Sequence, residues 1–222
     1  MDVYKVVEKF ISINGEGRKA GELACFIRFA GCNLNCGYCD TRWANASDVA
    51  YEEMSEHEIY EYIKSMGVKN VTLTGGEPLI QKDIHRLLKY LAEDNTLNVE
   101  IETNGAVDLN KFMDLPENVV FTMDYKLPGS GMEAMMCLSN LEIIRHIDCV
   151  KFVISNEADM NRATEIVRAY NLLDKTKVYY STAFGEITPA DVVEYMKHEG
   201  LNKVKLQLQL HKYIWTPEKR GV

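Results

Sequence analysis

The chain has 222 residues, 46% of them hydrophobic, and a formal net charge of −8; this is enough apolar material for one substantial core and predicts a single domain over residues 1–222. The acidic balance argues against nucleic-acid binding, and the sequence has neither a run of about 18 apolar residues that could span a membrane nor the N-terminal pattern of a signal peptide. We therefore expect a cytoplasmic protein with no membrane partner, in which the six cysteines are metal ligands or free thiols rather than disulfides.

The first elements are two predicted strands on either side of a glycine-containing turn. Residues 3–13 are rich in Val, Ile and Phe and predict a strand, and residues 14–17, Asn-Gly-Glu-Gly, suit a turn or a ligand-binding loop. Residues 24–30 predict a buried strand in which Arg28 is the exceptional residue. Because a buried charge is costly unless it is used, Arg28 should either form a buried ion pair or, as we favour, bind a carboxylate through two parallel hydrogen bonds.

Three cysteines follow this strand, in the loop 31–43. Cys32, Cys36 and Cys39 have the spacing C-x3-C-x2-C, and three thiolates this close can hold a soft metal centre. Structural zinc needs four ligands, which would require a distant residue such as His57. A [4Fe-4S] cluster held by three cysteines leaves one iron open for a small molecule. The spacing favours the cluster, with zinc or three unrelated thiols as the alternatives.

From residue 24 onward, predicted strands alternate with predicted helices. The later strands are expected over residues 68–74, 97–103, 118–124, 149–154, 177–182 and 203–210. Helices are expected after Ser55, over residues 84–91 and 132–146, after Asn156, and from Thr188 to about 199, followed by a mixed tail at residues 212–222. This α/β alternation predicts a parallel sheet or an incomplete TIM-like barrel with about six parallel strands. The loops after the strands, including the cysteine loop, should converge on one face.

The cysteine loop and residues 75–78, Gly-Gly-Glu-Pro, together resemble the radical S-adenosylmethionine (SAM) superfamily, over nearly the whole chain. More narrowly, the sequence is similar to the 7-carboxy-7-deazaguanine synthase family. The segments that carry this likeness are residues 13–17, 26–34, 39–41, 75–81, 102–105 and 209–212. Two positions depart from the family pattern: Asn14 replaces a common Gln, and residues 124–126, Asp-Tyr-Lys, replace a frequent Ser-Pro-Lys.

The resemblance implies a [4Fe-4S] cluster, SAM and Mg²⁺ as cofactors. It implies ring contraction of 6-carboxy-5,6,7,8-tetrahydropterin to 7-carboxy-7-deazaguanine with loss of ammonia, in the biosynthesis of queuosine or another deazapurine, with SAM regenerated in each cycle. The implied partners are this small-molecule pterin, an electron donor such as flavodoxin or ferredoxin, and a second copy of the chain in a homodimer. The alternatives are an activating enzyme that makes a glycyl radical on a partner protein, and a noncatalytic iron–sulfur or zinc-binding protein.

The resemblance also assigns roles to individual residues. The cluster ligands would be Cys32, Cys36 and Cys39, with Thr41 binding Mg²⁺. The substrate-binding residues would be Ile13, Asn14, Gly15, Glu16, Arg28 and Thr74. The SAM-binding residues would be Tyr38, Cys39, Asp40, Gly75, Gly76, Glu77, Asp124, Tyr125, Lys126 and Ser181. Thr103, His211 and Lys212 are weaker candidates. Simpler roles exist for some of these: a plain turn for Gly75 and Gly76, a local backbone hydrogen bond for Thr41, and an exposed turn acid for Glu16.

Overall fold

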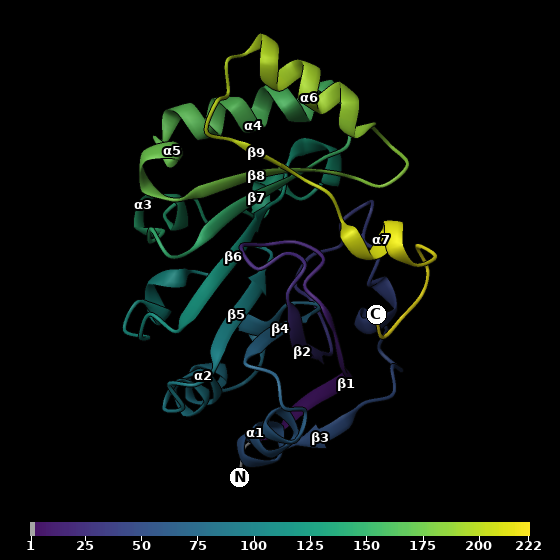
Figure 1. The fold of residues 1–222 in the computed structure, drawn as a ribbon, viewed down its shortest axis with the longest axis vertical. Helices are drawn as coiled ribbons and strands as arrows, with labels where there is room; N and C mark the ends of the chain where they lie inside the picture. The colour runs from purple at the N-terminus through teal and green to yellow at the C-terminus, as the bar shows by residue number, and fades with distance from the viewer. Residues whose placement is uncertain (1–2) are drawn as a thin grey trace.

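The computed structural model describes residues 3–222, which form one nine-stranded sheet (Figure 1). The strand order is β3-β1-β2-β4-β5-β6-β7-β8-β9. The strands are β1 (Tyr4–Ile13), β2 (Leu23–Phe29), β3 (Glu52–Met54), β4 (Asn70–Gly75), β5 (Asn98–Thr103), β6 (Val119–Tyr125), β7 (Cys149–Ile154), β8 (Lys177–Thr182) and β9 (Lys205–Gln207). From β2 through β4 to β9 all neighbouring strands are parallel, while β1 and β3 add an antiparallel edge. The sheet ends at β3 and β9, so the expected incomplete barrel is confirmed.

Most of the helices cover the outer side of this sheet, whereas the last one follows β9 at the open edge. They are α1 (Glu56–Ser65), α2 (Ile84–Ala92), α3 (Asn140–Ile143), α4 (Glu157–Ala169), α5 (Leu172–Lys175), α6 (Pro189–His198) and α7 (Leu210–Ile214). Figure 1 shows α4 and α6 lying over β7 to β9, with α2 beside β5. The stripe Ile84, Leu87, Leu88 and Leu91 of α2 is buried, and each such side chain contributes about 1.5–3 kcal/mol of hydrophobic stabilisation. No helix within residues 3–222 has the length and apolar character needed to cross a bilayer.

Residues 132–146 were predicted as one helix, and this prediction is wrong. They form a 3-10 turn at Glu133–Met135 and the four-residue α3. The buried Asn140 explains the difference, because its amide donates to the carbonyls of Gly105 (3.2 Å) and Val107 (2.8 Å) and accepts from Leu109 N (2.9 Å). These contacts tie the segment to the loop after β5 instead of extending a helix.

The strand predicted over residues 203–210 is much shorter than expected, because only Lys205–Gln207 pairs with β8. Gln207 exchanges two hydrogen bonds with the backbone of Gly17, both 2.9 Å long. Leu210 N then donates to Gly15 O at 3.1 Å. The open edge of the barrel at β9 is therefore held to the loop after β1, which places residues 14–17 beside the start of α7.

Candidate active site

One cavity of about 870 Å³ lies at the carboxyl ends of the parallel strands. The residues assigned from the sequence that line it are Ile13, Gly15, Glu16, Arg28, Cys32, Cys36, Tyr38, Cys39, Asp40, Thr41, Thr74, Gly75, Gly76, Thr103, Asp124, Lys126, His211 and Lys212. Four assigned residues do not line it: Asn14, Glu77, Tyr125 and Ser181. The loops after successive strands thus converge on one face, as such a sheet requires.

The three loop cysteines share this cavity. Cys32 Sγ accepts hydrogen bonds from Leu34 N (3.4 Å) and Asn104 Nδ2 (3.5 Å). Burial is the main reason that the pKa of Cys32 and of Cys36 is raised, and the Sγ of Cys39 adds to it in both cases. Thiols whose ionisation is opposed by burial, as those of Cys32 and Cys36 are, gain from a cationic centre that binds them as thiolates. Their placement fits a [4Fe-4S] cluster.

The zinc alternative finds no support in the ligand geometry. Within the part of the chain that the structure describes, no three His, Cys, Asp or Glu side chains converge closely enough to hold a single ion. Each thiol of a [4Fe-4S] cluster binds its own iron, so convergence on one atom is not required there. His57, the suggested fourth ligand, lies on α1 outside the cavity lining, with Nδ1 3.3 Å from the Tyr90 hydroxyl.

Gly75 and Gly76 are required by close approach of the protein backbone. Gly75 has φ +148°, and a Cβ there would collide with the backbone of Phe29. A Cβ on Gly76 would collide with the carbonyl oxygen of Gly31. Gly76 N donates to Phe29 O (3.1 Å) and Glu77 N to Gly31 O (2.9 Å). The pair therefore does more than form a plain turn: it fixes the start of the cysteine loop against β4.

Glu77 lies beneath the cavity, so its contacts differ from the expected SAM contact. It is fully buried, and burial raises the pKa of its carboxyl group to about 7. Oε1 accepts from Thr103 Oγ1 (2.9 Å) and Leu79 N (3.0 Å), and Oε2 accepts from Asn104 N (2.6 Å). Since Asn104 in turn donates to Cys32 Sγ, Glu77 positions a loop that contacts the first of the three loop cysteines.

Glu16 is a buried carboxylate, not an exposed turn acid. Oε2 accepts from Lys151 Nζ (2.9 Å) and Gln209 Nε2 (3.3 Å), and Oε1 accepts from Ser181 Oγ (2.7 Å). Burial acts to raise the pKa of Glu16, but the Lys151 ammonium and these hydrogen bonds outweigh it, so the pKa lies below its usual value. The Ser181 hydroxyl therefore donates to Glu16, whereas the family resemblance had assigned Ser181 to SAM.

Arg28 forms the ion pair considered from the sequence and still has guanidinium nitrogens that could bind a ligand. Its Nε lies 3.0 Å from Oε2 of Glu8, its register partner on β1. This ion pair uses only Nε, and no protein partner within residues 3–222 engages the two terminal guanidinium nitrogens. Because Arg28 also lines the cavity, those nitrogens can still bind a carboxylate.

Asp124 and Lys126 form a charged pair beside the cysteine loop. Lys126 Nζ is 2.9 Å from Asp124 Oδ2, and Lys151 Nζ is 3.5 Å from the same oxygen. Burial opposes the charge on Lys126, but Asp124 and Cys36 raise its pKa above the usual value. Asp124 Oδ1 is buried with no hydrogen-bond partner among the described residues. A polar ligand such as SAM would satisfy that oxygen.

Thr41 is half-buried, and its hydroxyl donates to Asp40 Oδ1 at 2.9 Å. A side chain, not the backbone, therefore takes the hydroxyl proton, and the oxygen keeps lone pairs for a hard cation. Asp40 Oδ2 pairs with Lys212 Nζ at 2.9 Å. Although burial opposes it, the Lys212 ammonium lowers the pKa of Asp40 to about 2.

Asn14 and Tyr125 lie behind the cavity wall. Asn14 is buried, and its Oδ1 accepts from Thr72 Oγ1 at 2.7 Å. The Tyr125 hydroxyl donates to Glu133 Oε1 at 3.3 Å. Sequence reasoning missed Lys151, which lines the cavity and contacts both Glu16 and Asp124. The signal that could have identified it is the one used for Arg28, a lone charge within an apolar strand.

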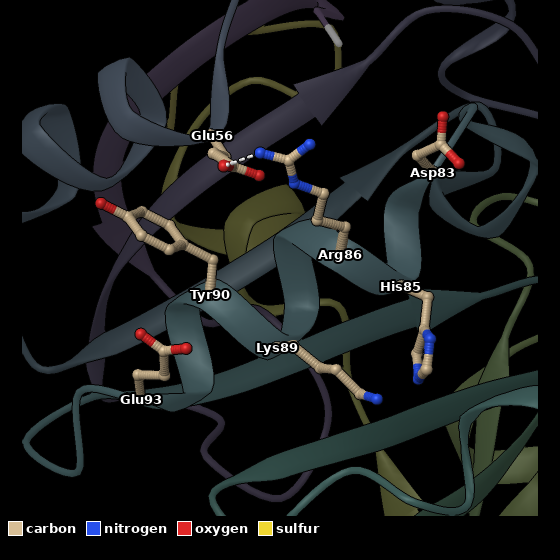
Figure 2. Close-up of a pocket in the computed structure, with 7 residues that line it drawn as sticks. All are labelled: Glu56, Asp83, His85, Arg86, Lys89, Tyr90 and Glu93. Atoms are coloured by element: carbon tan, nitrogen blue, oxygen red, sulfur yellow. Dashed lines mark hydrogen bonds and ion pairs between the residues drawn. The ribbon is translucent and has the colours of Figure 1, made fainter. Parts of the chain in front are cut away.

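A second hollow, of about 420 Å³, lies outside the sheet between α1 and α2 (Figure 2). Most of its charged side chains are engaged in surface pairs, such as Arg86 Nη2 with Glu56 Oε1 (2.5 Å) and Lys89 Nζ with Asp114 Oδ2 (2.8 Å). None of the assigned site residues lines it. The larger cavity is therefore the candidate active site.

The chain is similar to known proteins in both sequence and fold. Residues 26–125 match the sequence model of the radical SAM superfamily. The chain is 57% identical over 219 residues to 7-carboxy-7-deazaguanine synthase from Clostridium acetobutylicum, covering 99% of each chain. It is 36% identical over 240 residues to the enzyme of the same name from Leptospira interrogans, covering 98% of this chain and 97% of the relative. The crystal structure of QueE from Escherichia coli has the same fold, with a TM-score of 0.70, 21% identity and 93% of each chain covered.

Proposed function

Because the chain belongs to the 7-carboxy-7-deazaguanine synthase family of the radical SAM superfamily, we propose that it converts 6-carboxy-5,6,7,8-tetrahydropterin to 7-carboxy-7-deazaguanine. Ammonia leaves in this ring contraction, and the product serves queuosine or a related deazapurine. The observation that carries the proposal is one cavity that joins the three-cysteine loop to Glu16 and Arg28. Neither a glycyl-radical activator nor a simple metal-binding protein needs such a pair beside the cluster.

The cofactors are a [4Fe-4S] cluster and SAM, which together supply the radical that removes a hydrogen atom from the substrate. Cys32, Cys36 and Cys39 would hold the cluster. Asp124 and Lys126 would bind SAM, since they offer a buried acceptor without a partner and a charged donor. Gly75, Gly76, Tyr38 and Asp40 line the same cavity and would contact SAM beside them.

The substrate would lie on the side of the cavity nearer β1 and β2. The terminal nitrogens of Arg28 would bind its carboxylate, and Glu16 would accept hydrogen bonds from the N–H edge of the pterin. Ile13, Gly15 and Thr74 line this part of the cavity, together with His211. Residues 217–222 also line the cavity, and the Arg220 guanidinium stacks 3.9 Å from the centre of the Trp43 ring. This tail would limit the access of water to the reacting groups.

Three further features belong to the proposal. Mg²⁺ would bind the Thr41 hydroxyl oxygen, with substrate oxygens and waters completing an octahedral shell. A flavodoxin or ferredoxin would supply the electron. A homodimer in the cytoplasm is expected from the family resemblance.

The test is a product assay. Reduced, cluster-replete protein is incubated without oxygen with SAM and 6-carboxy-5,6,7,8-tetrahydropterin, with and without Mg²⁺, and the products are identified by mass. We expect 7-carboxy-7-deazaguanine in many-fold excess over 5′-deoxyadenosine, because SAM is regenerated, and faster formation with Mg²⁺. SAM cleavage with no pterin product would favour the protein-activating alternative, and no cleavage by a reducible cluster would leave only metal binding.

A further inference from the structure

Lys151 is a buried cation within the proposed substrate site. Its side chain is 9% exposed and lines the cavity from β7. Its ammonium lies 2.9 Å from Glu16 Oε2 and 3.5 Å from Asp124 Oδ2. We propose that Lys151 is a positioning residue for the pterin, because it holds Glu16 as an oriented anion that accepts hydrogen bonds from the substrate's N–H edge. This inference rests on the proposed function and deepens it.

Three elements hold the Glu16 carboxylate from different sides. Lys151 comes from β7, Ser181 from β8 and Gln209 from the segment after β9. Ser181 and Gln209 are neutral donors. Among the residues that the structure describes, Lys151 is therefore the only cation that bonds to this carboxylate. A buried carboxylate without a cation is costly, and such a group takes up a proton instead.

The other charged groups around Glu16 cannot replace Lys151. Glu102 on β5 is a like charge that interacts unfavourably with Glu16, and Asp124 on β6 competes for the same ammonium. His211 on α7 also faces Glu16, but burial lowers its pKa and favours the neutral ring. Without Lys151, burial and Glu102 would therefore raise the pKa of Glu16 above its usual value.

The protonation of Glu16 decides which hydrogen bonds it can make. An ionised carboxylate is an acceptor on both oxygens, whereas the protonated acid presents a donor to one side. The N–H edge of a pterin offers hydrogen-bond donors, which the ionised carboxylate can accept. If Glu16 is protonated, its O–H is itself a donor and cannot accept a hydrogen bond from the pterin N–H. Pterin affinity should therefore follow the ionisation of Glu16.

The test uses 6-carboxypterin, a non-reacting aromatic analogue with the same N–H edge and carboxylate. Its dissociation constant is measured over a range of pH on cluster-replete protein with SAM, for the wild type and for Lys151→Met. At neutral pH the variant should bind at least about tenfold more weakly. This is the loss expected if the pKa of Glu16 in the variant lies about one unit above the pH of the measurement. The ratio of the two dissociation constants should fall toward one as pH rises and Glu16 ionises. Taking this ratio cancels the titration of the ligand itself.

Matched variants separate this role from a structural one. Lys151→Gln should show the same pH-dependent loss of 6-carboxypterin affinity as Lys151→Met. Lys151→Arg keeps the positive charge and should bring the ratio of variant to wild-type dissociation constants close to one. Ser181→Ala removes a neutral donor but leaves the Lys151 ammonium on the same carboxylate, so any pH-dependent loss of affinity should set in at lower pH than in the two neutral variants of Lys151. In a Glu16→Gln background, Lys151→Met should produce no pH-dependent change.

Two results would overturn the proposal. One is wild-type affinity in both neutral variants of Lys151; the other is a loss that is independent of pH and persists in the Glu16→Gln background. A wild-type protein that binds SAM but not 6-carboxypterin would instead reject the proposed function, and this inference with it.

Discussion

Arg28 and Lys151 show how far a single charged residue in a buried strand can be interpreted. Each is costly to bury, and each has a carboxylate partner, Glu8 for Arg28 and Glu16 for Lys151. The sequence can identify the charge as exceptional, but it cannot name the partner, because Glu16 lies 135 residues from Lys151 along the chain. Which carboxylate pairs with Arg28 and which with Lys151 therefore becomes clear only from the tertiary structure.

Replacing Arg28 with Lys keeps the positive charge and removes the planar fork. One ammonium cannot pair with Glu8 and also bind the substrate carboxylate through two parallel hydrogen bonds. We expect Arg28→Lys to weaken 6-carboxypterin binding by about 1–3 kcal/mol, the scale of charge-assisted hydrogen bonds. SAM binding, measured by calorimetry on the same protein, should hardly change. Equal weakening of both ligands would mean that Arg28 is a structural residue.

At the scale of elements, the sequence predicts best where the decisive signal is local. The strands expected over residues 149–154 and 177–182 coincide with β7 and β8, because a short run rich in β-branched and aromatic residues between polar breaks favours a buried strand. The helix expected after Ser55 begins there with a capping box, in which Ser55 and Glu58 satisfy each other's backbone N–H groups.

Prediction fails where one buried amide decides the local structure. The helix expected over residues 132–146 gives way to the hydrogen bonds of Asn140, and the strand expected over 203–210 ends where Gln207 binds the backbone of Gly17. For the site, the convergence of the loops followed from topology. The contacts of Glu77 could not be foreseen, since they join three separate segments.

The turn after β4 provides a test at this scale. A Cβ on Gly76 would collide with the Gly31 carbonyl oxygen and with Asn45, so Gly76→Ala must displace the start of the cysteine loop. Overpacking of this kind costs about 1–3 kcal/mol, which should lower the midpoint of urea unfolding. Gly37→Ala is the matched control within the cysteine loop, because its nearest neighbours would lie 3.9 Å from the new Cβ. If the two variants unfold at the same midpoint, the close approach does not contribute to stability.

For the whole molecule, parallel topology gathers the chemistry at one end of the barrel and leaves the remaining thiols elsewhere. Cys25 on β2 and Cys149 on β7 are fully buried, and burial raises the pKa of each thiol to about 12. Cys137 lies in the segment before α3, 3.2 Å from Ser139 Oγ. None of these three lines the cavity, so the six cysteines divide into three that line the cavity, the proposed ligands, and three that lie in the core or a loop.

This division predicts two classes of cysteine variant. Ala at Cys32, Cys36 or Cys39 should abolish stable cluster binding after anaerobic reconstitution. A [4Fe-4S] cluster held by three thiolates already lacks one protein ligand, and the variant would leave a second iron without one. Ala at Cys25, Cys137 or Cys149 should leave about four irons per chain, measured by iron and sulfide analysis and by the visible absorption of the cluster. A Cys36→Ala protein that kept its full iron content would contradict the assignment of the ligands, since it would require a ligand from outside the loop. Loss of iron in Cys149→Ala alone, with a lowered unfolding midpoint, would instead indicate that β7 had been disrupted, so unfolding is measured on every variant.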